Sequence, residues 1–182
     1  MKKIILKYGG YAALFELITF ILTWLIIDIT NVSHWVQGFI GYVTIISPLV
    51  FVYFGIRYYR DRVNNGTITF LKGLGIGLLI VTIPTISFAI IETVYVLYID
   101  PKFYDNIMAY DIGEYRKVMS PAQFAIKLNE MKQALVLYHN PFYNFFGMIL
   151  TVGALGIIVT LISSVLLVRK VKIEGSTKTA VA

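Results

Sequence analysis

The sequence contains no cysteine, which excludes disulfide bonds, thiolate metal sites and cysteine nucleophiles. Histidine is also rare: His34 and His139 are the only two, and two histidines with scattered aspartates do not form a metal-binding pattern. Zincin, nucleophile-elbow and P-loop motifs are missing as well. The sequence therefore offers no catalytic, metal-binding or cofactor-binding constellation, and we expect a protein that is not an enzyme and uses no cofactor.

Charged residues are scarce, at 14% of 182 residues, whereas hydrophobic residues make up 58%. Soluble domains are about a quarter charged. Four apolar runs are long enough to cross a hydrocarbon core of roughly 30 Å as helices, and they cover residues 8–27, 36–58, 70–98 and 142–168. The first run is too long for a signal-peptide core and has no cleavage site after it, so we expect it to be retained. The sequence predicts an all-α fold, a four-transmembrane-helix bundle forming one membrane domain over residues 1–182.

Basic residues are concentrated around three segments: the N-terminus, the linker after the second span and the C-terminal tail. Eleven of the 16 lie there: Lys2, Lys3, Lys7, Arg57, Arg60, Arg62, Lys72, Arg169, Lys170, Lys172 and Lys178. By the positive-inside rule, both termini are cytoplasmic and residues 99–141 are extracytoplasmic. These clusters are typical of topology signals and anionic-lipid contacts, so we expect no nucleic-acid partner. The tail, residues 171–182, is expected to be flexible.

The long outer segment contains its own helix-start signals. A capping residue followed by proline occurs at Asp100, Ser120 and Asn140, and this pair is typical of helix starts. Ser120 and Gln123 also fit a capping box. The segment 99–141 therefore predicts an extracytoplasmic helical hairpin, with helices over 101–118 and 121–138, between the third and fourth membrane helices.

The second predicted hairpin helix is amphipathic. Its apolar residues recur at intervals of three and four and form one stripe: Phe124, Leu128, Met131, Leu135 and Tyr138. We expect this stripe to pack over the outer end of the bundle or at the lipid headgroups, beside Phe103, Ile107 and Tyr110 of the preceding helix. A partner protein that covers the stripe is the alternative.

Two acidic residues, Glu16 and Glu92, fall within predicted membrane spans, where an ionisable side chain costs roughly 2.5–3.5 kcal/mol and usually faces protein or water. Glu16 shares a small, polar helix face with Gly9, Ala12 and two threonines, so we expect it to point into the bundle. The candidate intramembrane polar site comprises Glu16, Thr19, Thr23, Thr85 and Glu92. Two interpretations are open: a proton or cation site, or neutral carboxyl groups hydrogen-bonded to neighbouring hydroxyls.

Proline and glycine mark further positions within the spans. Pro48 and Pro84 lie in the middle of the second and third runs and predict kinks. Gly73 and Gly77 form a G-x-x-x-G pattern, which allows close helix packing. Packing within the chain is the simpler interpretation of this pattern, and homodimerisation is the alternative.

Several sequence runs together resemble a known family. They are FGIRYYRD at 54–61, followed by NG at 65–66 and ITFLKG at 68–73, and later HNPF at 139–142 and LVRK at 167–170. This pattern resembles a bacterial integral membrane family known as domain of unknown function 4199. The resemblance implies a four-pass inner-membrane protein and no assigned activity, so it transfers no functional residues.

Two functions fit these features. We expect a non-enzymatic accessory or scaffold component of the bacterial inner membrane, whose partners are the lipid bilayer and either a second copy or another membrane protein. The alternative is a small oligomeric transporter or ion pathway that uses Glu16 and the proline-containing helices. That alternative requires Glu16 and Glu92 to line one connected polar cavity.

Overall fold

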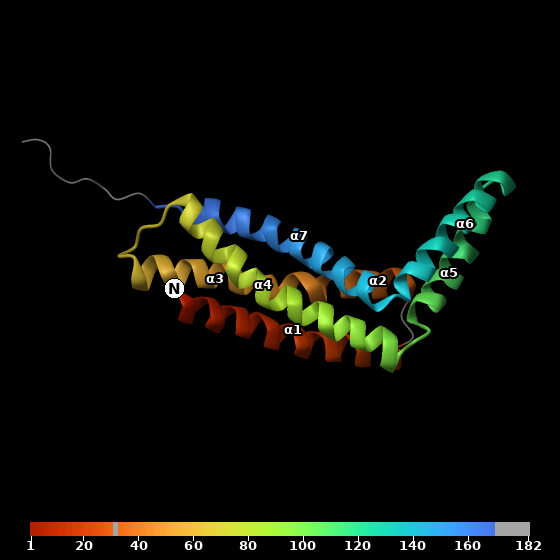
Figure 1. Ribbon diagram of the computed structural model, residues 1–182, viewed down its shortest axis with the longest axis horizontal. Helices are drawn as coiled ribbons and strands as arrows, with labels where there is room; N and C mark the ends of the chain where they lie inside the picture. The colour runs from red at the N-terminus through yellow and green to blue at the C-terminus, as the bar shows by residue number, and fades with distance from the viewer. Residues whose placement is uncertain (31–32, 170–182) are drawn as a thin grey trace, which may run out of the picture.

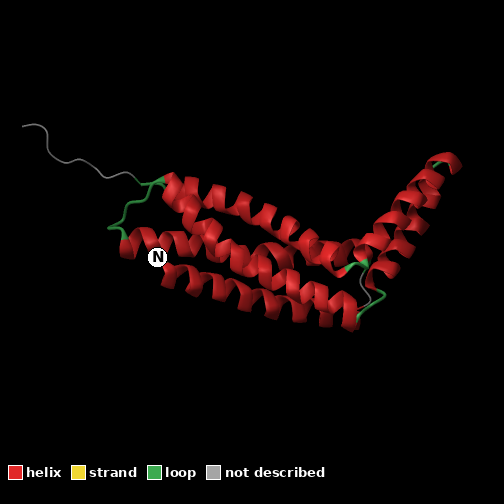
Figure 2. Ribbon diagram, in the orientation of Figure 1, coloured by secondary structure: helices red, strands yellow, loops and turns green. Residues whose placement is uncertain are grey.

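The computed structural model describes residues 1–30 and 33–169, and almost all of these residues are helical (Figure 2). Four helical stretches are long and apolar enough to cross a membrane; they cover Lys2–Ile27, Trp35–Val63, Phe70–Ile99 and Pro141–Leu167. They form an elongated bundle, and two further helices project from one end of it (Figure 1). The predicted all-α, four-transmembrane-helix fold is confirmed. The predicted flexible tail, 171–182, lies outside the described residues.

Three of the membrane spans differ little from the predicted runs. Helix α1 covers Lys2–Thr30 and extends beyond the apolar run at both ends. Helix α4 covers Phe70–Val94 and continues as one π-helical turn, η3 (Tyr95–Ile99). Helix α7 covers Pro141–Leu167. Its start is fixed by the side chain of Asn140, whose Oδ1 accepts hydrogen bonds from the next two free backbone N–H groups at 3.0 and 3.2 Å.

The second span is interrupted where proline was predicted to disturb it. Helix α2 (His34–Ile46) gives way to a short 3₁₀ segment, η1 (Ser47–Leu49), and then to α3 (Val50–Tyr58), which ends in a π-helical turn, η2 (Tyr59–Val63). Pro48 lies within the 3₁₀ segment because its ring lacks an N–H and cannot continue the α-helical hydrogen-bond ladder. Pro84, in contrast, lies inside the unbroken helix α4.

Helix α4 forms the centre of the bundle and contacts α1, α3 and α7. Its glycines make the close approach possible. A Cβ on Gly77 would collide with the methyl group of Thr160 on α7, and a Cβ on Gly73 would lie 3.2 Å from the Ser164 hydroxyl. Reciprocally, a Cβ on Gly156 of α7 would collide with Val81. The G-x-x-x-G pattern therefore packs within the chain, and this face is not available to a second copy.

Helix α1 exposes an apolar side on the face away from Glu16. Its residues are 39–58% exposed in a chain without lipid: Leu14, Ile18, Ile21 and Leu25. Such apolar exposure along a helix suits contact with acyl chains.

Helices α5 (Phe103–Val118) and α6 (Pro121–Tyr138) form the hairpin. The predicted capping box is present at Ser120 and Gln123. The predicted helix start at Asp100–Pro101 is wrong by two residues. The Asp100 side chain instead accepts a hydrogen bond from the backbone N–H of Lys102 at 3.2 Å, in the turn that leads out of η3.

The predicted packing of the α6 stripe over the bundle is also wrong. The hairpin projects from the bundle (Figure 1), and no residue of α5 or α6 is fully buried. The stripe instead faces α5, where Met131 and Leu135 share a small groove with Met108. Ile107 lines this groove as expected, but Tyr110 is 41% exposed. The neighbouring helix thus half-buries the stripe, which a single-helix pattern could not reveal.

Candidate functional site

A polar network joins the hairpin to the bundle. Glu92 of α4 is only 7% exposed, and its Oε1 accepts a hydrogen bond from the Tyr104 hydroxyl of α5 at 2.6 Å. Asn144 of α7 donates to the same hydroxyl at 3.1 Å. The Thr93 hydroxyl in turn donates to the Asn144 carboxamide oxygen at 3.4 Å. Three helices therefore converge on one half-buried tyrosine hydroxyl.

Tyr104 is held in place by its ring as well as its hydroxyl. Its ring stacks on Tyr138 at the end of α6, with centroids 4.7 Å apart and planes 19° apart. Burial, with a contribution from the charge of Glu92, raises the pKa of Tyr104, so the phenol remains a hydrogen-bond donor. Beside it, His139 Nε2 lies 3.3 Å from Asp105 Oδ2 and links the end of α6 to the start of α5. The base of the hairpin is thus fixed in direction.

Sequence analysis identified Glu92 but not its two partners. Asn144 carried a usable signal, since it is a lone amide near the start of an otherwise apolar helix. Tyr104 carried none, because tyrosine is common throughout this chain and its burial depends on where α5 meets the bundle.

A cavity of about 760 Å³, here named the junction cavity, lies beside this network. Its walls come from α1, α2, α4, η3, α5 and α7. The aromatic part of the lining includes Phe20, Trp24, Trp35, Tyr95, Phe103 and Tyr104. Two glycines of α2, Gly38 and Gly41, also line it, and a Cβ on either would meet nothing within 4 Å. The two glycines leave open space on this side of α2, between its other lining side chains.

The polar lining of the junction cavity carries one sign of charge. Glu92, Asp100 and Asp111 line it, and no lysine, arginine or histidine does so among the described residues. The second oxygen of Glu92, Oε2, is buried and has no hydrogen-bond partner in the described chain. Thr23 and Thr44, also in the lining, bond to each other with their hydroxyl oxygens 2.6 Å apart. Three carboxyl groups, one of them with an unpartnered buried oxygen, thus line a space whose other walls are largely aromatic and aliphatic.

Glu16 is separate from this cavity. Its side chain is fully buried, as predicted, but neither carboxyl oxygen has a partner among the described residues. The expected hydrogen bonds to neighbouring hydroxyls are therefore missing. Thr19, one turn away, donates to the backbone oxygens of Phe15 and Glu16 instead. A threonine within a helix readily bonds to the carbonyl of the preceding turn, which removes it from the carboxyl group.

The five predicted polar residues do not form one site. Thr23 and Glu92 line the junction cavity, whereas Glu16 does not. Thr85 is buried with an unpartnered hydroxyl. The functional role of this set stays a prediction.

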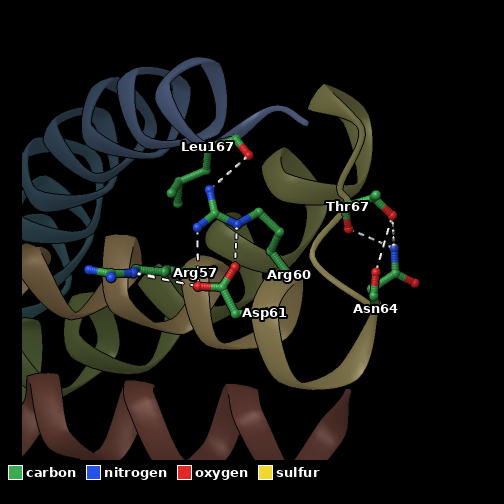
Figure 3. A network of polar contacts seen from close by, with 6 residues as sticks. All are labelled: Arg57, Arg60, Asp61, Asn64, Thr67 and Leu167. Carbon is green, nitrogen blue, oxygen red and sulfur yellow. Dashed lines mark hydrogen bonds and ion pairs between the residues drawn. The ribbon is translucent and has the colours of Figure 1, made fainter. Parts of the chain in front are cut away.

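A second polar cluster lies at the opposite end of the bundle (Figure 3). Arg60 is 7% exposed and binds Asp61 through two nitrogens, at 2.6 and 3.1 Å. Its remaining terminal nitrogen donates to the carbonyl oxygen of Leu167, the last residue of α7, at 3.4 Å. A cation at the C-terminal end of a helix is favoured by the helix dipole. Arg60 was predicted only as a topology signal, and the structure adds this capping contact.

The linker after Arg60 is held by its own turn. Asn65 and Gly66 have positive φ angles of 50° and 77°, as the Asn-Gly turn signal predicts. Ile68 then pairs with Arg169 through two backbone hydrogen bonds of 3.0 and 3.1 Å. The second linker and the end of α7 are therefore joined directly.

No group of three or more histidine, aspartate or glutamate side chains that could hold a metal ion occurs in residues 1–30 and 33–169.

A family model described as "protein of unknown function (DUF4199)" matches residues 7–169. The chain belongs to the DUF4199 family. The match includes all four membrane spans, the hairpin and both polar clusters, so the resemblance noted in the sequence is confirmed. No curated protein and no solved structure matches this DUF4199 chain.

Proposed function

We propose that this DUF4199 protein is a non-enzymatic accessory or scaffold component of the bacterial inner membrane, which presents the α5–α6 hairpin to another protein of the same membrane. The observation that carries the proposal is the fixed base of the hairpin. The Glu92–Tyr104–Asn144 network and the Tyr104–Tyr138 stack tie it to the bundle, while the rest projects free of the bundle (Figure 1). A helical extension that is held in a fixed direction is better suited to binding another protein than to catalysis.

The surface of the hairpin supports this proposal. Because α5 half-buries the apolar stripe of α6, the stripe needs no partner. The outward side of α6 still exposes Ile126 by 65% and Val136 by 72%. A non-obligate interface needs no larger apolar area than this, because its composition resembles that of the rest of a protein surface.

The arrangement of the ends supports the proposed orientation. The Tyr8 ring at the start of α1 contacts Tyr58 at the end of α3, and Ile68 pairs with Arg169 beyond α7. The start of α1, the second linker and the end of α7 thus share one end of the bundle, together with most of the basic residues. We propose that this end is cytoplasmic. Reporter fusions after residue 182 and near residue 120 test this orientation: a reporter active outside the cytoplasm at residue 182 would refute it.

Site-specific photo-cross-linking in native membranes tests the scaffold role. A photoreactive residue at Ile126 or Val136 should give one recurrent protein adduct, and Ile126→Asp should remove the adduct formed at position 136. Leu150 is a matched control, because it is 74% exposed on the lipid-facing side of α7 and should give lipid adducts. Adducts only with lipid at all three positions would contradict the proposal.

The transporter alternative has less support. It requires Glu16 and Glu92 in one connected cavity, and Glu16 is not part of the lining of the junction cavity.

A further inference from the structure

We propose that the junction cavity is a binding site for an amphipathic organic cation, an apolar body carrying one ammonium group. The cavity adjoins the base of the hairpin, since Tyr104 and five other residues of α5 line it, but it does not include Ile126 and Val136, the exposed side chains of α6 on which the scaffold role is tested. Its size fits such a ligand, since a volume of about 760 Å³ lies within the roughly 300–1,000 Å³ of small-molecule pockets.

The charge of the lining selects the sign of the ligand. Glu92, Asp100 and Asp111 all line the cavity, and no described basic side chain offsets them there. An anionic ligand would meet three carboxyl groups beside apolar walls, where repulsion is screened less than in bulk water. A cation is attracted by the same groups.

The unpaired oxygen of Glu92 indicates where the ammonium group binds. The Glu92 side chain is more than nine-tenths buried, its Oε1 is occupied by Tyr104, and its Oε2 has no partner. A buried acceptor without a partner costs about 1–3 kcal/mol. An ammonium N–H of the ligand would supply the missing donor and would balance the carboxylate charge.

The aromatic walls suit both parts of the ligand. Trp24 of α1 and Trp35 of α2 line the cavity together with Tyr95 and Phe103. Aromatic faces attract cations within about 6 Å of the ring centre, tryptophan most strongly. They also provide the apolar area that an alkyl or aryl body needs. The combination of a buried carboxyl group and aromatic walls is the chemistry that recognises an organic ammonium ion.

The chain carries its own reporter for a binding experiment, since Trp24 and Trp35 are its only tryptophans and both line the cavity. The protein is placed in nanodiscs of neutral phosphatidylcholine and titrated at neutral pH with three compounds that share one body. They are 4-phenylbutylammonium, 4-phenylbutanol and 4-phenylbutanoate, with charges of plus one, zero and minus one. The cation should give a saturable change in tryptophan fluorescence, the alcohol should bind at least tenfold more weakly, and the carboxylate should not bind.

Two variants test the position of the site, each with a matched control. Glu92→Gln retains an acceptor for Tyr104 and should lower the affinity for the cation at least tenfold, to that of the alcohol, whereas Glu16→Gln changes a buried acid outside the cavity and should leave binding unchanged. Gly41→Phe fills the cavity from a position where a Cβ is unobstructed and should abolish binding. Gly147→Phe is its control, because a Cβ on Gly147 is equally free and Gly147 does not line the cavity.

The results separate binding at this site from partitioning into lipid. A cation preference that is lost in Glu92→Gln and Gly41→Phe but kept in both controls supports the proposal. Equal responses to all three compounds, or cation binding that survives Gly41→Phe, overturn it. If Glu92→Gln fails to fold, Gly41→Phe and its control still decide the question.

Discussion

The close packing of α4 on α7 makes a sharp prediction about two glycines of α4. A Cβ on Gly77 would collide with the Thr160 methyl group and would lie 3.0 Å from Ile56 Cδ1. Thr160 cannot turn away easily, because it is fully buried and its hydroxyl donates to the Gly156 carbonyl at 2.7 Å. Gly75, half a turn away, is exposed, and a Cβ there meets nothing within 4 Å. Replacement by alanine should therefore affect the free energy of unfolding differently at the two positions.

The expected magnitudes follow from two opposing contributions. Replacing glycine by alanine within a helix favours the helix by roughly 0.8–1.0 kcal/mol, and at Gly75 nothing opposes this gain. At Gly77, overpacking costs about 1–3 kcal/mol and cancels or exceeds the gain. The free energy of unfolding should thus be lower for Gly77→Ala than for Gly75→Ala by about 1–3 kcal/mol.

Thermal unfolding in one detergent, followed by far-UV circular dichroism, measures this difference. At about 2–4 °C per kcal/mol for a chain of this size, the two melting temperatures should differ by on the order of 2–12 °C. A Gly77→Ala protein that melts at or above the temperature of Gly75→Ala would refute the claim that α4 and α7 pack through this glycine.

Three further substitutions follow from the polar and apolar contacts. Tyr104→Phe removes the donor to Glu92 while keeping an aromatic ring, so it should lower the free energy of unfolding by about 1–3 kcal/mol in a detergent melt; an unchanged melt would mean that the network adds nothing. Glu16→Met should melt at or above the natural temperature, because the buried carboxyl group has no partner and an apolar replacement of similar size is tolerated; a marked loss would reveal a contact that the carboxyl group makes. Leu128→Asp should destabilise the hairpin by roughly 1 kcal/mol, about half of the value for full burial of such a side chain, measured by hydrogen exchange in α6, whereas the exposed control Ile126→Asp should have little effect; equal effects would show that α5 does not cover the stripe.

The candidate site illustrates where sequence reasoning stops. The burial of Glu16 follows from its helix face, since small and polar neighbours at helical spacing identify the side that avoids lipid. The partners of Glu92 do not follow, because Tyr104 and Asn144 lie on other helices. Their approach depends on the angle at which α5 leaves the bundle. The hydrogen bonds expected at Glu16 are not formed, for a related reason. Thr19 bonds to the backbone of its own helix instead, and the pattern of residues on a helix face does not show whether a hydroxyl group will do so.

Local physics determined the number of the helices and several of their ends, although not the start of α5 or the unbroken helix around Pro84. Each membrane span follows from an apolar run matched to the bilayer thickness, and the starts of α6 and α7 follow from capping residues before proline at Ser120 and Asn140. The break in the second span follows likewise from the missing N–H of Pro48. All of these effects act within one or two turns of helix, so the order of residues is sufficient to predict them.

Only the tertiary structure decided what each face of these helices contacts. The α6 stripe could have met the bundle, lipid or a partner. It meets α5 instead, because that neighbouring helix offers a matching apolar side. The junction cavity is lined by residues from helices that are distant in sequence, with Gly38 and Gly41 leaving open space on α2. Arg60 caps α7 because Leu167, distant in sequence, ends beside it. Contacts of this kind depend on how non-neighbouring helices cross, and no periodicity within a single helix encodes that.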